Sequence, residues 1–153
     1  MEGRKALDEN AKKCWARTVI RVRPESYWLV SLPHGSIRQA ASVVSESKRH
    51  FAAFVLEEDE VSLTVEEKLW NARSHSIPHH ASEGPYRAIT FQLNVDLGVC
   101  GYFAPAADRL AEAGIPIVPQ CAYSKDHVLV RAADADRAAE ILNRLVRECS
   151  ENR

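Results

Sequence analysis

Residues 94–117 read NVDLGVCGYFAPAADRLAEAGIPI, and this stretch decides the fold. Gly98 and Gly101 bracket a turn, and Pro105 follows at the first turn of a helix, where a missing N–H group does no harm. Small and apolar residues then recur at helical spacing up to the next glycine, which ends the helix. The stretch therefore predicts a glycine-containing loop that leads into a helix and then into a strand at Ile115–Cys121.

Strand patterns flank this stretch on both sides. The run from Tyr86 to Leu97 is apolar and alternating, and His127–Arg131 is a returning strand after a tight turn at 123–125. Asp134 then caps a last helix that extends through Cys149 and carries apolar residues on one face. The second half of the chain is predicted to run strand, helix, strand, strand, helix.

The first half repeats this order and adds one strand. Two β-branched or aromatic runs precede a helix, a hairpin across acidic residues, and a second short helix. The predicted elements are strands at Thr18–Val22 and Tyr27–Leu32, a helix at Ser36–Ser47, strands at His50–Leu56 and Val61–Val65, and a helix at Glu66–Asn71. Pro24 is expected to end the first of these strands.

We expect an α+β protein built from two small units. The predicted parts are a flexible N-terminal arm at 1–16, an N-terminal unit at 17–72, a linker at 73–84 and a C-terminal unit at 85–149. A split βαβ unit needs a fourth strand, and the second unit ends after its last helix without one. Thr18–Val22 is the candidate for that edge, and the run from Tyr86 to Leu97 is long enough to end one sheet and begin the next. The units are then interlocked through shared or exchanged edge strands.

The composition excludes several classes of protein. The 153 residues carry 20 basic and 21 acidic side chains, and a net charge of -1 lacks the basic excess of a dedicated nucleic-acid binder. No apolar run approaches the ~20 residues that cross a bilayer, and residues 1–5 lead into polar sequence instead of a signal peptide. We therefore expect a cytoplasmic protein that binds neither nucleic acid nor membrane. The four scattered cysteines are expected to be reduced thiols.

Three segments of the second half resemble an ACT domain. They are Asn94–Pro105, Leu110–Ile117 and Tyr123–Val130, and the similarity extends from Tyr86 to about Leu145. Together they resemble the tandem ACT proteins related to CASTOR-type cellular arginine sensors. The resemblance implies two ferredoxin-like ACT units of βαββαβ type and a regulatory protein that binds a free amino acid between paired units. It also implies a homodimer or a regulatory protein partner, with no catalytic activity and no cofactor.

The local chemistry agrees with an amino-acid site. A loop that ends at a helix N-terminus presents free backbone N–H groups, which suit a carboxylate, and Gly101 allows close approach to the backbone. By resemblance, Asp126 contacts the cationic end of the ligand. The proposed ligand-binding residues are Val99, Cys100, Gly101, Pro119, Gln120, Cys121 and Asp126. The alternative for Asp126 is a turn aspartate that bonds its own backbone, and the alternative for Gly98 and Gly101 is simple turn geometry.

Two further groups of residues could in principle carry chemistry. Cys100 at a helix N-terminus with His127 as base would be a nucleophile, but no third group orients the pair in the sequence. His75, His79 and His80 lie in the Ser/Pro-rich linker without a fixed fourth ligand, so we expect solvated histidines and no metal site. The rival function is a protein-interaction module whose ACT pocket is empty and whose exposed apolar patch binds a partner.

Overall fold

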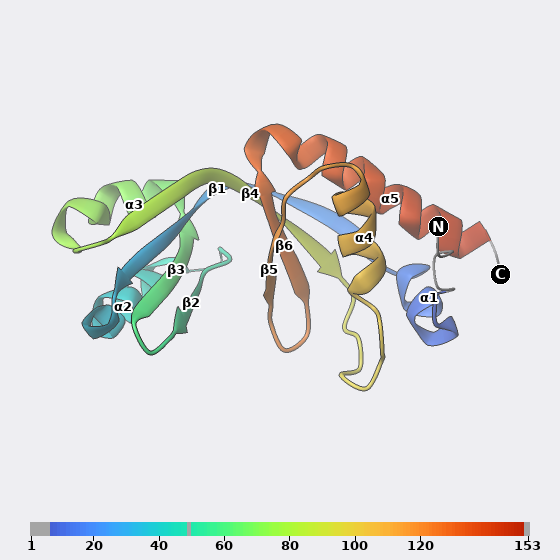
Figure 1. Cartoon of the computed structure of the whole chain (residues 1–153), viewed down its shortest axis with the longest axis horizontal. Coiled ribbons are helices and arrows are strands. Elements are labelled where there is room, and N and C mark those ends of the chain that lie inside the picture. The colour runs from blue at the N-terminus through green and yellow to red at the C-terminus, as the bar shows by residue number, and fades with distance from the viewer. Residues whose placement is uncertain (1–6, 49, 152–153) are drawn as a thin grey trace. The chain divides into compact units, whose positions relative to one another are not determined.

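The structure, a computed structural model, describes residues 7–48 and 50–151. The helices are α1 (Glu9–Trp15), α2 (Ile37–Glu46), α3 (Glu67–Arg73), α4 (Ala104–Glu112) and α5 (Ala135–Glu151) (Figure 1). The strands are β1 (Val19–Pro33), β2 (Ala53–Leu56), β3 (Glu60–Glu66), β4 (Ala81–Gln92), β5 (Val118–Cys121) and β6 (Asp126–Arg131). The fold is mixed α+β, with the strands in the order β2-β3-β1-β4-β6-β5. Among the described residues, no helix has both the length and the apolar character of a membrane span.

Contacts within the chain divide it into two compact units. Unit 1 combines the described residues up to Arg23 with those from Ile89 onward, and unit 2 runs from Pro24 to Ala88. The chain passes from one unit to the other within β1 and again within β4. The boundary therefore differs from the expected linker at 73–84. In that stretch the backbone forms a 3-10 turn at Ser74–Ser76, Ile77 is buried in the core of unit 2, and β4 begins at Ala81.

β1 is one continuous strand where two were expected. Pro24 was expected to end the first strand, but the fixed φ of proline is compatible with extended backbone, and the strand runs through it from Val19 to Pro33. The part of β1 before Pro24 belongs to unit 1 together with β5 and β6. Thr18–Val22 was the predicted candidate for the missing edge strand of the C-terminal unit. In the structure, the part of β1 from Val19 to Arg23 belongs to that unit.

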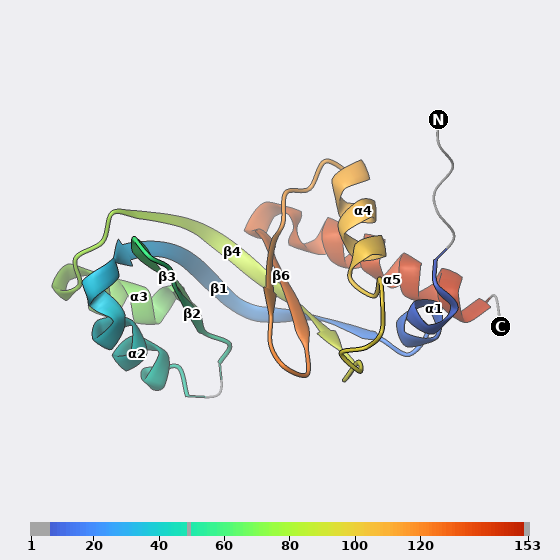
Figure 2. The same ribbon diagram turned by 60° about the horizontal axis from the view of Figure 1, so that its bottom comes forward.

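Unit 2 packs two helices on one face of its strands. Its sheet order is β2-β3-β1-β4, and the register places Val30 opposite Leu63 and Leu32 opposite Val61. Their side chains form one core with Ala40 and Val43 of α2 and with Trp70 of α3, and Figure 2 shows both helices. Ile37, Ala40 and Val43 recur at helical spacing, so they lie on the one face of α2 that packs into this core.

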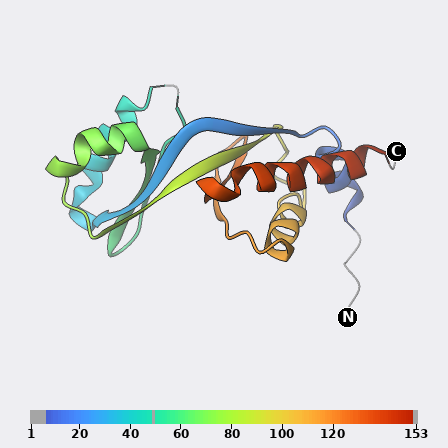
Figure 3. The ribbon, with the colours of Figure 1, turned by 90° about the horizontal axis from the view of Figure 1, so that it is seen from above.

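Unit 1 contains the other four-strand arrangement, in the order β1-β4-β6-β5. β5 and β6 pair in antiparallel register, with Cys121 opposite Asp126. α4 and α5 contact one another and contribute Leu110 and Leu142 to a core that also includes Phe91 of β4. α1 packs against α5, as Figure 3 shows from above.

The expected flexible arm is a helix over Glu9–Trp15, and residues 1–6 lie outside the described residues. Asp8 caps this helix by accepting hydrogen bonds from the amides of Asn10 and Ala11 at 2.9 and 3.2 Å. Trp15 is 0% exposed, and its ring lies 5.1 Å from the Tyr102 ring and 5.2 Å from the Phe91 ring. The segment is ordered because one large aromatic side chain completes the unit 1 core.

The substitution Trp15→Ala tests whether Trp15 anchors the N-terminal helix in the core of unit 1. Loss of a fully buried tryptophan is expected to lower the free energy of unfolding by about 3–5 kcal/mol, as large-to-small core substitutions do. Urea denaturation measures the change. The exposed Arg17, just beyond α1, provides the control, and Arg17→Ala is expected to stay within about 0.5 kcal/mol of wild type. If Trp15→Ala lowered the free energy of unfolding as little as the control does, the original prediction of a flexible arm would be favoured instead.

Candidate functional site

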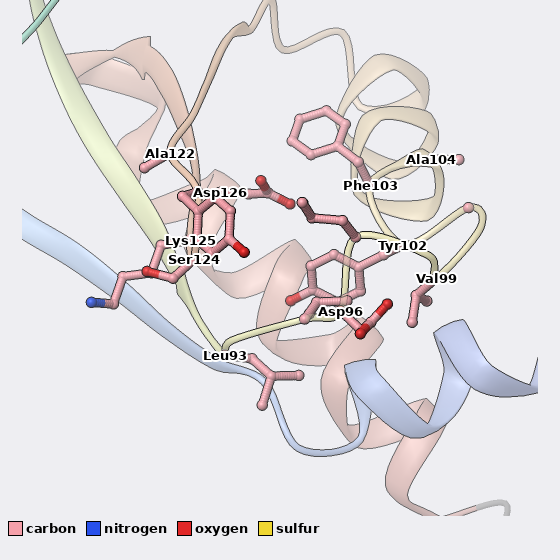
Figure 4. Close-up of a pocket in the computed structure, with 14 residues that line it drawn as sticks. Leu93, Asp96, Val99, Tyr102, Phe103, Ala104, Ala122, Ser124, Lys125 and Asp126 are labelled. Carbon is pink, nitrogen blue, oxygen red and sulfur yellow. The ribbon is translucent and has the colours of Figure 1, made fainter.

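A pocket of about 290 Å³ lies in unit 1 between two loops (Figure 4). One loop joins β4 to α4, and the other is the turn of the β5–β6 hairpin. Apolar side chains form most of the wall, and Asp96, Lys125 and Asp126 are its charged residues. The lining residues are Leu93, Val95, Asp96, Leu97, Val99, Gly101, Tyr102, Phe103, Ala104, Ala122, Tyr123, Ser124, Lys125 and Asp126.

The β4–α4 loop is shaped by Asp96. Its carboxylate accepts a hydrogen bond from the Gly98 amide at 2.7 Å, and its carbonyl accepts one from the Val99 amide at 3.0 Å. The Val99 N–H group is therefore already used within the loop, so the expected carboxylate contact from the Val99 backbone would have to replace this hydrogen bond. The amides of Cys100 and Gly101 donate no hydrogen bond within the described part of the chain. Gly101 has φ 75°, a left-handed conformation that favours glycine.

Tyr102 attaches this loop to the core. Its side chain is 6% exposed, its hydroxyl lies 2.8 Å from the Thr18 hydroxyl, and its carbonyl accepts a hydrogen bond from the Trp15 indole at 2.6 Å. Burial is the main cause that raises the pKa of Tyr102 to about 12, and the nearby Asp126 carboxylate adds to the increase. Tyr102 is therefore a neutral phenol that holds the loop and does not titrate near pH 7.

Asp126 begins β6, and its carboxylate extends into the space between the two loops (Figure 4). Cys121 lies opposite Asp126 across the hairpin, and the pKa of its thiol is raised to about 11 by desolvation and by its hydrogen bond to that carboxylate. In the same view Lys125 directs its ammonium group away from the pocket. Asp96 and Asp126 therefore set the charge that a bound molecule meets, which favours a cation.

The structure brings only part of the predicted site together. Val99, Gly101 and Asp126 line the pocket, whereas Cys100 faces a neighbouring groove. The predicted wall of Pro119, Gln120 and Cys121 lines neither the pocket nor that groove, because the hairpin contributes its turn at 122–126 instead of β5. Asp96, Phe103 and Tyr123 were missed. The D-x-G spacing of Asp96 and Gly98 was a signal for the turn, since aspartate side chains bond amides two residues on.

The suggested pairing of Cys100 with His127 is not supported by the geometry. Cys100 is exposed in the groove, whereas His127 is 3% exposed, and its Nδ1 lies 2.9 Å from the Thr90 hydroxyl. Arg23 Nε donates to the same hydroxyl at 3.0 Å, so His127 belongs to a buried polar cluster with Thr90 and Arg23. Burial first, and the Arg23 charge second, lower the pKa of His127 to about 4.

The linker histidines show no metal-site geometry. His79 packs edge-on against Trp70 at 5.1 Å, and its Nδ1 lies 3.0 Å from the Ile77 carbonyl. Among the described residues, no group of three or more His, Cys, Asp or Glu side chains is placed to hold a metal ion.

Comparison with known proteins identifies an ACT domain at residues 81–144. No curated protein matches the sequence. A Vibrio cholerae protein of unknown function, described as a possible transport protein, has a similar structure, with a TM-score of 0.70, 19% identity and coverage of 90% of this chain and 97% of its own. A protein from Agobacterium tumefaciens also has a similar structure, with a TM-score of 0.66 and 20% identity. The match covers 84% of this chain and 89% of that protein's chain.

The regulatory subunit of aspartate kinase from Thermus flavus is also similar. Its TM-score is 0.59 at 11% identity, and the match covers 82% of this chain and 95% of that subunit. At such identities these structures establish the fold alone. The ACT domain, which includes the candidate pocket, is consistent with a regulatory role in binding a small molecule.

The neutral His127 predicts how stability depends on pH. Its pKa is about 4 in the folded chain against 6.5 ordinarily, so below pH 6.5 the unfolded chain binds a proton that the folded chain does not. The free energy of unfolding therefore has its full value, as far as His127 is concerned, above pH 6.5. It decreases as the pH falls from 6.5 toward 4, by roughly 3 kcal/mol in total. Urea denaturation between pH 7.5 and about 4 is expected to show a shallower pH dependence for His127→Gln than for wild type.

The exposed His75 supplies the control for this measurement. His75→Gln replaces an exposed side chain outside the His127 cluster and is expected to keep the wild-type pH dependence. Equal pH dependence of wild type and His127→Gln would show that the buried imidazole is not the group responsible.

Proposed function

We propose that this protein is a regulatory module that binds a free amino acid in the unit 1 pocket, with arginine as the favoured ligand, and that it has no catalytic activity of its own. One observation carries the proposal. Gly101 and Asp126 line the same small pocket, and the Gly101 amide donates no hydrogen bond among the described residues; the Cys100 amide, also without a hydrogen bond there, adjoins Gly101 in the same loop. An amino acid with a second cationic group is a ligand that satisfies both demands.

The two ends of such a ligand would meet different groups. The amides of Cys100 and Gly101 precede α4 and suit the α-carboxylate, since N–H groups near a helix N-terminus attract anions. Asp126, supported by Asp96, would receive the guanidinium group, whose planar donors match a carboxylate. The pocket volume of about 290 Å³ fits a small ligand.

The middle of the ligand would meet apolar side chains. Leu97 and Tyr123 lie on opposite loops of the pocket and are 76% and 83% exposed. Side chains of this kind are unfavourably hydrated when nothing covers them, and the methylene groups of arginine would shield part of both surfaces. This apolar contribution explains why a ligand with only the two charged ends would bind less well.

The finer architecture belongs to the same proposal. In unit 2 the elements run β1, α2, β2, β3, α3, β4, which is the βαββαβ order of a ferredoxin-like ACT unit. In unit 1 they run β4, α4, β5, β6, α5, and β1 takes the place of the fourth strand. We propose a tandem ACT protein related to CASTOR-type arginine sensors, with the two units interlocked by β1 and β4.

The regulated assembly is also proposed from similarity. Several structural neighbours are regulatory subunits or domains of aspartate kinases, and another is aspartokinase III from E. coli in complex with aspartate and ADP, of which the match covers 33%. This favours a chain that controls another protein, as a homodimer or with a separate regulatory partner in the cytoplasm. The rival interaction module with an empty pocket predicts no selective amino-acid binding.

A thermal-shift screen against the twenty amino acids tests the function. Selective binding to the folded protein raises its melting temperature, so arginine is expected to increase Tm more than leucine or glutamate. A flat response at millimolar concentrations would favour the rival interaction module.

Asp126→Asn tests the assigned recognition of the cation. The amide keeps the shape and removes the charge, so arginine binding is expected to weaken by about 1–3 kcal/mol, the scale of a charge-assisted hydrogen bond. Calorimetric titration of wild type and variant with arginine and with leucine measures the difference. Asp59→Asn, in the exposed turn of the other unit's hairpin, is the matched control and is expected to bind as wild type does. Equal losses for both ligands, or no loss, would mean that Asp126 is a turn residue.

A further inference from the structure

A second cavity of about 730 Å³ lies in unit 1 behind the ligand loop. It is a groove between α1, α4 and α5, and it is larger than the amino-acid pocket. Its lining residues are Leu7, Asp8, Glu9, Lys12, Cys100, Gly101, Ala104, Pro105, Asp108, Arg109, Leu145, Glu148 and Cys149. We call it the three-helix groove.

The floor of the three-helix groove is apolar. Pro105, Leu145 and Cys149 are buried at its base, and Leu7 and Ala104 continue the apolar surface. A floor of this kind across several helices suits the apolar face of an amphipathic segment, which anchors itself in such grooves by burying side chains at helical spacing.

The rim of the groove is acidic. Four carboxylates border it against two cations, Lys12 and Arg109. Arg109 is held by Glu148 in a two-pronged ion pair, with distances of 3.2 and 2.5 Å, and that carboxylate raises the pKa of the guanidinium. Glu9 and Asp108 are exposed on the rim and form no ion pair with another described residue, which leaves a negative field for a partner to match.

The groove and the amino-acid pocket share a wall. Gly101 and Ala104 line both cavities, and Cys100 between the two glycines of the loop faces the groove. A ligand held by the Cys100 and Gly101 amides on one side would therefore change the groove surface on the other. By thermodynamic linkage, a segment bound in the groove changes the affinity for the ligand by the same factor.

We propose that the three-helix groove is the output surface of the protein, and that it binds a basic amphipathic segment of the regulated partner with an affinity that the amino acid alters. The coupling rests on the proposed function, whereas binding of the segment itself does not. The partner is thus expected to present leucine-like residues on one helical face and lysine or arginine beside them.

Fluorescence anisotropy with two labelled fifteen-residue probes tests the proposal. One amphipathic probe contains leucine and lysine, and the other has glutamate in place of every lysine. We expect the lysine probe to bind and the glutamate probe not to bind. The double variant Glu9→Gln with Asp108→Asn should weaken the lysine probe about threefold to tenfold, the scale of a few exposed charge contacts. Glu58→Gln, an exposed acid of unit 2, should bind the probe as wild type does.

Cys100 reports where the probe binds. Cys100 and Cys121 are the exposed thiols, so in a Cys121→Ser background the rapid reaction with Ellman's reagent reports Cys100. The lysine probe is expected to slow this reaction, and saturating arginine is expected to change the probe Kd at least threefold. Three results would contradict the groove as the binding site of the probe. They are equal binding of both probes, a rim variant that binds as the Glu58→Gln control does, and a Cys100 reaction rate that the probe does not change. If arginine binds but leaves the probe Kd unchanged, the groove is not an output surface controlled by the amino acid. If arginine does not bind at all, the proposed function is wrong, and the result with the probe still stands.

Discussion

The hydrogen bond from the Trp15 indole to the Tyr102 carbonyl is the contact on which unit 1 depends. It joins the helix before the first strand to the loop before α4, two segments far apart in the sequence, and the two rings stack at 5.1 Å beside Phe91. A buried carbonyl without a donor is costly, and so is a cavity of tryptophan size. The loop that borders the candidate pocket is therefore held in place by Trp15, a residue far from it in the sequence. The N-terminal helix thus supports the position of the loop.

The same constraint explains why the site is in unit 1. There the loop after β4 is long, is tightened by Asp96 and is anchored at Tyr102, and among the described residues two successive amides of this loop, those of Cys100 and Gly101, donate no hydrogen bond. In unit 2 a single 3-10 turn, His34–Ser36, joins β1 directly to α2. Glu60 begins β3 as Asp126 begins β6, but it accepts a hydrogen bond from Ser31 and is thus already occupied. Two units with the same element order therefore differ in their capacity to hold a ligand.

Local patterns predicted most of the elements, because spacing and turn residues act within a few positions. The glycine-to-proline stretch placed α4 correctly, and the β-branched runs placed β3 and β6. What the sequence did not show depends on distant contacts. Residues 1–16 were predicted to be a flexible arm because the partners of Trp15, which are Phe91 and Tyr102, lie far away in the sequence and are brought to it by the fold. Pro24 looked like a strand end, although extended backbone accepts proline. The pocket wall was assigned to β5 because sequence alone does not reveal which end of a hairpin faces the loop.

The most direct test of the account is an amide-resolved NMR titration of the whole chain with arginine. If the amino acid sits between the two loops, the largest shifts will occur at the amides of Cys100, Gly101 and Asp126, with smaller changes in their neighbours at 93–99 and 122–125. The amides of His34–Ser36 and Glu60 in unit 2 will stay near their free positions. Shifts that concentrate in unit 2, or the absence of saturable shifts in the two loops at millimolar arginine, would contradict the assignment of this pocket.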